Sequence, residues 1–183
     1  MQTYKRRVSE RTIWTIGHST RSIDEFLELL EVHSIAQVVD VRTVPRSGRH
    51  PHFNADSLST SLLVSGRGYE HCPDLGGLRK PHRDSTNLGW RHPSFRGYAD
   101  YMQTTRFCDA VVRLEALARS PTAIMCAEAV WWRCHRQLIA DAMVARGNRV
   151  LHILGVRPAE PHQLTSFARV VDGNVDYPGL PGL

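Results

Sequence analysis

Residues 12–41 read TIWTIGHSTRSIDEFLELLEVHSIAQVVDV and contain the pattern that decides the fold. The first six, residues 12–17, are mainly β-branched or aromatic and predict a buried strand. Ser22 and Glu25 have the spacing of a capping box, and the apolar positions that follow predict an amphipathic helix. Residues 36–41 predict a second buried strand. A strand, a helix and a strand in succession form a βαβ unit, which requires a parallel sheet and a right-handed crossover.

The last third of the chain repeats this pattern. Residues 122–126 (TAIMC) and 149–154 (RVLHIL) predict strands, and the helix expected between them covers about 134–146, with Gly147 at the left-handed C-cap position. We expect the four strands at 12–17, 36–41, 122–126 and 149–154 to be neighbours in one sheet. The predicted fold class is therefore α/β, a single domain with a mainly parallel sheet flanked by helices in a Rossmann-like three-layer arrangement.

The middle of the chain predicts fewer regular elements. A short helix is expected at 54–64, a strand at 68–72 and a long helix at 98–119, which Ser120 and Pro121 end. Residues 73–93 contain turn residues without periodicity, which predicts a long, basic, irregular insertion. The expected organisation is a disordered basic N-terminus over 1–11, a single α/β domain over 12–157 and a loosely attached tail over 158–183.

Composition excludes several classes of protein. The chain of 183 residues is 42% hydrophobic and 22% charged, as in ordinary globular domains. No run approaches the roughly 20 apolar residues of a membrane span, and no signal peptide is apparent. Four cysteines in a chain of this length do not indicate a disulfide-stapled secreted fold. We therefore expect a cytoplasmic protein without a membrane partner, and the net charge of +5 favours anionic partners.

Polar residues follow three of the predicted strands. These residues are His18 and Ser19 after the first strand, Asp40 and Arg42 around the end of the second, and Cys126 and Glu128 at the end of the third. Sites in open parallel sheets form beyond the carboxyl ends of the strands. We therefore expect these side chains to line one cleft.

The segment CAEAVWWRCHR, residues 126–136, carries the strongest catalytic pattern. A helix is predicted to begin near Cys134, and a helix N-terminus lowers the pKa of a thiol and attracts anions. Cys134 or Cys126 is therefore a candidate nucleophile or redox thiol, Glu128 and His135 are candidate proton-transfer groups, and Arg136 is a candidate anion clamp.

Structural roles are the alternative for these residues. Cys134 precedes Leu138 by four positions and can face the core, and Cys126 lies in an apolar strand, where cysteine commonly packs. A carboxylate at Glu128, beside buried strands, needs a partner, which Arg42, Arg133 or Arg136 can supply. A purely structural network that holds the last helix in place is therefore a further interpretation.

A metal site is a second alternative. Cys126, Cys134 and His135 together offer ligands for a soft metal ion. Their spacing matches none of the usual zinc patterns, and adjacent residues on a helix diverge by about 100° of rotation. The sequence therefore favours the absence of a metal.

Two groups of basic residues, mainly arginines, lie between the predicted strands at 36–41 and 122–126. The first comprises Arg42, Arg46, Arg49, His50 and His52, and the second comprises Arg79, Lys80, His82, Arg83, Arg91 and Arg96, with Trp90, Phe95 and Tyr98 among them. Arginines with aromatic residues can bind phosphates and stack on bases, although a solvated loop is the alternative for 79–91. The predicted substrate-binding residues are His18, Ser19, Asp40, Arg42, Arg46 and Arg136, and Ser19 can instead serve only as a cap or turn residue.

Three motifs carry a family resemblance: TIGHST (15–20), VVDVRTVPRS (38–47) and CAEAVWWRCHR (126–136) followed by LIADAMVARG (138–147). They resemble the domain of unknown function 488 family over about 12–154. The commoner form of the family has an acidic-proline step between the glutamate and CHR, where this chain has AVWW, and similar tryptophan-bearing versions exist. The resemblance implies an α/β domain with a suspected catalytic role.

These observations predict an enzyme that acts on an anionic substrate, either a small molecule such as a nucleotide or a nucleic acid. Cys126, Glu128, Cys134 and His135 are its predicted catalytic residues. The sequence does not identify a cofactor. The alternative is a non-catalytic nucleic-acid-binding or metal-binding module that uses the arginines of residues 79–96.

Overall fold

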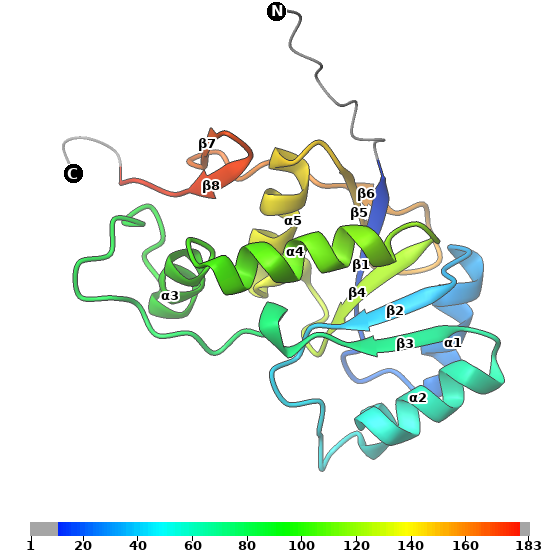
Figure 1. Cartoon of the computed structure of the whole chain (residues 1–183). Coiled ribbons are helices and arrows are strands. Elements are labelled where there is room, and N and C mark those ends of the chain that lie inside the picture. Colours follow the sequence, from blue (N-terminus) through cyan, green and yellow to red (C-terminus); the bar gives the residue numbers. More distant parts are fainter. Residues whose placement is uncertain (1–10, 180–183) are drawn as a thin grey trace, which may run out of the picture.

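The computed structural model describes residues 11–179, which surround one central sheet of six strands (Figure 1). The strand order is β3-β2-β4-β1-β5-β6. In chain order the strands are β1 (Thr12–Gly17), β2 (Gln37–Asp40), β3 (Gly68–His71), β4 (Thr122–Cys126), β5 (Arg149–Ile153) and β6 (Glu160–Pro161). The first five are parallel and β6 is antiparallel to β5, so the four predicted strands are confirmed as parallel neighbours.

The strand order brings the polar strand ends together. β4 lies between β2 and β1, with Met125 opposite Asp40 and Cys126 opposite Gly17. Because all three strands run in the same direction, the loops that follow them leave the sheet at the same edge. The site therefore forms where β2, β4 and β1 end.

Helices cover both faces of the sheet, as a three-layer α/β fold requires. One face is covered by α1 (Ile23–Val32) and α2 (Ala55–Val64), which pack Phe26, Leu30 and Leu58 into one core cluster. The other face is covered by α4 (Thr105–Leu117) and α5 (Arg136–Ala145) (Figure 1). Among the helices of residues 11–179, none has the length and apolar composition needed to cross a membrane.

The helix ends show how local sequence sets these elements. The side chain of Ser22 accepts from the backbone of Glu25, whose carboxylate accepts from the backbone of Ser22, so the capping box at α1 is confirmed. The single helix predicted at 98–119 is wrong, because the chain forms α3 (Pro93–Tyr101) and then α4. Thr104 breaks the run, since its hydroxyl caps the start of α4 at Phe107.

The irregular insertion is confirmed between the short helix η2 (Pro73–Leu75) and α3, but it is tied to the domain. The buried carboxylate of Asp100 accepts from the backbone of His82, the hydroxyl of Ser85 and the amide of Asn87. Each of these bonds satisfies a donor that the insertion would otherwise leave to water. The carboxylate on α3 therefore fixes the path of the insertion.

The prediction of a loosely attached tail is wrong for the described residues from 158 to 179. They form β6 and the hairpin of β7 (Arg169–Val171) and β8 (Asn174–Asp176), and they bury Val175 and Tyr177 in the core. The tyrosine hydroxyl donates to Asp141 on α5 at 2.8 Å. Because the tail is mainly polar, its composition gave no indication that Val175 and Tyr177 are buried. Most of the N-terminal segment predicted to be disordered, residues 1–10, lies outside the described residues.

Candidate active site

A cleft of about 680 Å³ opens at the carboxyl edge of the sheet, and we call it the basic cleft. Loops after β1, β2 and β4 line it together with residues 77–78. Among its lining residues are seven that the sequence singled out as site residues: His18, Ser19, Arg42, Arg46, Cys126, Glu128 and His135. The structure therefore brings residues from three distant segments into one cavity.

A second cavity of about 300 Å³ adjoins the basic cleft. Cys126, Glu128 and His135 line both cavities, whereas Cys134 lines only the second one. Phe95 and Tyr98 give the second cavity an apolar wall, and this wall was not expected from the sequence. The shared residues form the boundary at which a ligand in either cavity would meet sulfur, imidazole and carboxylate groups.

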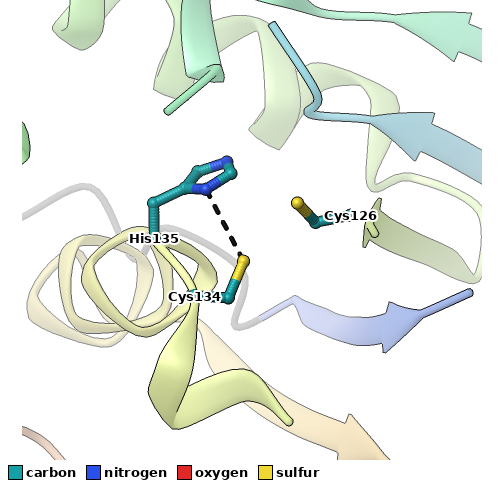
Figure 2. A group of neighbouring side chains, drawn as sticks. All are labelled: Cys126, Cys134 and His135. Atoms are coloured by element: carbon teal, nitrogen blue, oxygen red, sulfur yellow. Dashed lines mark hydrogen bonds between the residues drawn. The ribbon is translucent and has the colours of Figure 1, made fainter. Parts of the chain in front are cut away.

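Cys126, Cys134 and His135 form a compact group, the cysteine–histidine cluster (Figure 2). One ligand atom from each residue lies within 4.8 Å of the others. The sulfur of Cys134 lies 3.5 Å from Nδ1 of His135, and Nε2 of His135 donates to the carbonyl of Val41 at 3.0 Å. Because the carbonyl can only accept, Nε2 carries the proton, and Nδ1 of the neutral ring presents its lone pair to the sulfur.

The two thiols have opposite pKa shifts. The hydrogen bond with the Cys126 thiol lowers the pKa of Cys134 well below its ordinary value, and His135 and Arg136 act in the same direction. That hydrogen bond and burial together raise the pKa of Cys126. The first proton lost from the pair therefore leaves Cys134 as the thiolate, with Cys126 as the thiol that donates to it.

The backbone explains why adjacent residues converge on one point. Cys134 has an extended conformation, with φ −130° and ψ 151°, and caps the short helix η3 (Trp131–Arg133). The predicted helix at 134–146 instead begins at Arg136, with His135 as its N-cap. The divergence of about 100° applies only to two residues within one helix. Cys134 and His135 are therefore not separated by this divergence, and the expectation that they would be is wrong.

Asp40, Arg42 and His18 form a buried framework behind the basic cleft. Nε of Arg42 donates to Asp40 at 2.9 Å, and its Nη1 donates to Nε2 of His18 at 3.3 Å. Nδ1 of His18 donates to the carbonyl of Ser19, and burial lowers the pKa of His18 to about 4. His18 is therefore neutral at pH 7. Asp40 does not line the cleft, so it positions Arg42 and does not contact a ligand there.

Arg136 and Glu128 differ from what the sequence predicted. Arg136 is 1% exposed and donates to the backbone carbonyls of Glu128 and Ala129, so it holds the loop after β4 and does not line either cavity. The carboxylate of Glu128 is exposed and makes no ion pair or hydrogen bond within residues 11–179. The expected pairing of a buried Glu128 with Arg42, Arg133 or Arg136 is wrong, because the loop turns this side chain toward the cavities.

The two groups of arginines have different environments. Arg46 and Arg49 are exposed, line the basic cleft and have no side-chain partner among the described residues. In the second group, by contrast, Trp90 stacks on Phe95 with ring centroids 4.8 Å apart, and Arg79 lies over the ring of Tyr101. The aromatic residues of residues 79–96 therefore pack within the domain.

Two glycines that the sequence analysis did not single out shape the site. A side chain at Gly17 would place its Cβ 1.9 Å from the carbonyl oxygen of Glu128, and one at Gly77 would place its Cβ 2.9 Å from Nδ1 of His135. Each glycine lets another segment approach closely. The only local signal for the contact between Gly17 and Glu128 is the sequence TIG at the end of the first strand. The contact between Gly77 and His135 depends on long-range packing.

This arrangement permits two kinds of chemistry. Transfer of the Cys134 proton to Nδ1 of His135 gives a thiolate beside an imidazolium, which keeps its other hydrogen bond to Val41. The same three donors can instead lose two thiol protons and bind a cation. Cys134 is 5% exposed, which limits direct attack on a substrate in the basic cleft. Glu128, by contrast, reaches both cavities.

Comparison with known proteins shows that the chain matches one protein family. The family model described as "Domain of unknown function DUF488" matches residues 22–143, a range that contains the motif segments around Arg42 and from Cys126 to Arg136. No curated protein and no solved structure matches the chain.

Proposed function

The chain belongs to the DUF488 family, and from that premise we propose that it is an enzyme acting on a small anionic substrate bound in the basic cleft. One observation carries the proposal. A single cavity combines exposed arginines and a carboxylate, none of which has a side-chain partner within residues 11–179, with Cys126 and His135 of the cysteine–histidine cluster. Positive charge attracts the anion, and the other groups supply proton transfer and electron donation.

The size of the cleft supports a small molecule as substrate. A volume of about 680 Å³ lies within the range of roughly 300–1,000 Å³ for small-molecule sites, which suits a nucleotide or another phosphorylated metabolite. Arg46 and Arg49 bind the anionic group, because arginine matches phosphate and carboxylate oxygens with paired donors. The neutral imidazole of His18 lies beside them without adding charge.

Glu128 is the proton-transfer group of this proposal. Its exposed carboxylate borders both cavities, and nothing within residues 11–179 neutralises it. A carboxylate in this position can remove a proton from a nucleophile or, once protonated, donate it to a leaving group.

The proposal also assigns the protein to the cytoplasm, where Cys72, Cys108, Cys126 and Cys134 would remain reduced.

The alternative function, nucleic-acid binding through residues 79–96, has less support. Stacking on bases needs aromatic faces that are free, but Trp90 also contacts Phe167 and Tyr177 with ring centroids 5.0 and 5.4 Å away. We therefore keep this surface as the control in the experiment and make no second proposal.

The test is calorimetric titration with AMP at low salt, comparing two double variants. We expect Arg46→Gln/Arg49→Gln to weaken AMP binding at least tenfold, which corresponds to about 1.4 kcal/mol. The matched control, Arg83→Gln/Arg91→Gln, removes the same charge from exposed positions outside the cleft and should bind as the wild type does. Equal losses in both variants, or no binding of AMP or phosphate by the wild type, would overturn the proposal.

A further inference from the structure

The cysteine–histidine cluster has the spacing of a metal site. For zinc, with bonds of about 2.3 Å to sulfur and about 2.0–2.1 Å to nitrogen, tetrahedral ligand atoms lie about 3.5–3.8 Å apart. The observed separation of 3.5 Å between the sulfur of Cys134 and Nδ1 of His135 fits this geometry. The sulfur of Cys126 completes a set of three ligands within 4.8 Å of one another.

The orientation of His135 is that of a metal ligand. Its Nε2 donates to the carbonyl of Val41, which leaves Nδ1 as the lone pair directed toward the sulfur atoms (Figure 2). Histidine ligands of metals almost always donate their other ring N–H to a carbonyl or carboxylate in this way. The ring is also confined, because Gly77 lies against it and the ring of Tyr98 is 5.2 Å away between centroids. The ligand is therefore oriented before any ion arrives.

We propose that Cys126, Cys134 and His135 bind one zinc ion, whose fourth coordination position faces the cavities. Two thiolates and an imidazole suit zinc, whereas magnesium and calcium prefer oxygen ligands. Three protein ligands with one open position are typical of catalytic rather than structural zinc sites. Cys126 and His135 line the basic cleft, so a ligand in the cleft can reach the ion.

This inference deepens the proposed function but only in part rests on it. The identification of Cys126, Cys134 and His135 as ligands depends only on the observed distances and hydrogen bonds. The role of the ion rests on the proposed function: zinc at this wall would polarise an oxygen of the bound anion, while Glu128, two residues after a ligand, moves the proton. The two thiols each lose a proton when the ion binds, so binding releases protons to the solvent.

The first experiment measures zinc in the reduced, full-length protein and in matched cysteine variants. We expect one zinc ion per chain, and zinc affinity at least about 100-fold lower in Cys126→Ser and Cys134→Ser, since loss of even an outer-shell partner costs 10–100-fold. Cys72→Ser and Cys108→Ser change thiols outside the cluster and should retain zinc as the wild type does. Unchanged zinc affinity in the Cys126→Ser/Cys134→Ser double variant would overturn the inference.

A second measurement does not depend on how the variants fold. X-ray absorption at the zinc edge of the wild-type protein should find two sulfur atoms at about 2.3 Å and nitrogen or oxygen at about 2.0–2.1 Å. A coordination shell without sulfur, or the absence of stoichiometric zinc, would refute the metal site.

If zinc binds but AMP does not, only the proposed function fails. If AMP binds to the cleft of a protein that takes up no zinc, only the metal inference fails.

Discussion

Gly17 shows how one residue positions the whole loop from Cys126 to Ala129. The backbone of His18 donates to the carbonyl of Cys126 at 3.0 Å, and that of Ser19 donates to Ala127 at 2.9 Å. These bonds hold the loop close against the end of β1, and only the missing side chain of Gly17 leaves space for it. The position of Glu128 therefore depends on a glycine in another segment of the chain.

We predict that Gly17→Ala lowers the free energy of unfolding by about 1–3 kcal/mol, because a Cβ 1.9 Å from a backbone oxygen forces the loop to move. Urea denaturation measures this loss. Gly155→Ala is the control, since no atom lies within 4 Å of its added Cβ. Similar stabilities of the two variants would show that the loop does not depend on the close contact.

At the residue scale, the sequence predicted which side chains form the site better than it predicted where each side chain points. The motif from Cys126 to Arg136 contained the cluster, because side-chain chemistry is local information. The direction in which the Arg136 side chain points depends on where α5 begins. The helix begins two residues later than expected, and Arg136 therefore donates to loop carbonyls and does not bind an anion in the cleft. The same shift brought Cys134 and His135 together.

Among the elements, the C-terminal tail and α5 are joined through one buried carboxylate. Asp141 is 0% exposed and accepts from Nε2 of His162 at 2.9 Å and from the backbone of Thr165 at 2.9 Å, in addition to Tyr177. Nδ1 of His162 in turn accepts from His152 on β5. The tail is thus attached to the helix that follows the cysteine–histidine cluster.

Replacing Asp141 with alanine should lower the free energy of unfolding by about 3–5 kcal/mol, because three buried donors lose their acceptor. The expected effect of Asp109→Ala, an exposed carboxylate on α4, is within about 0.5 kcal/mol. Thermal denaturation compares the two. A small effect for Asp141→Ala would mean that the tail contributes little to stability.

The elements that the sequence predicted are those with local periodicity. β1, β4 and α1 each carry a complete pattern of apolar positions or caps, and their bounds are close to expectation. The tail carries no such pattern, because its stability comes from contacts with Asp141 more than 20 residues away in the chain. Its packing could not be predicted from composition.

For the whole molecule, topology brings the site together. The βαβ pattern predicted a parallel sheet, and parallel strands place their carboxyl ends at one edge. The pattern did not predict that β4 lies between β2 and β1, which is the order that unites Arg42, Glu128 and His18 around one cleft. The path of the insertion, which brings Gly77 against His135, is likewise a property of the complete fold.

The most direct test of the central claim, that the basic cleft is an active site, is turnover by the purified protein, assayed both with and without added zinc. Phosphorus NMR follows a panel of nucleotides and other phosphorylated metabolites with the wild type and Glu128→Gln, and with Glu28→Gln on α1 as the control. We predict that the wild type converts at least one compound, that Glu128→Gln lowers kcat/KM by roughly 100-fold or more, and that its stability stays within about 0.5 kcal/mol of the wild type. Equal rates for the wild type and Glu128→Gln, or no conversion of any compound that binds the cleft, would contradict the account.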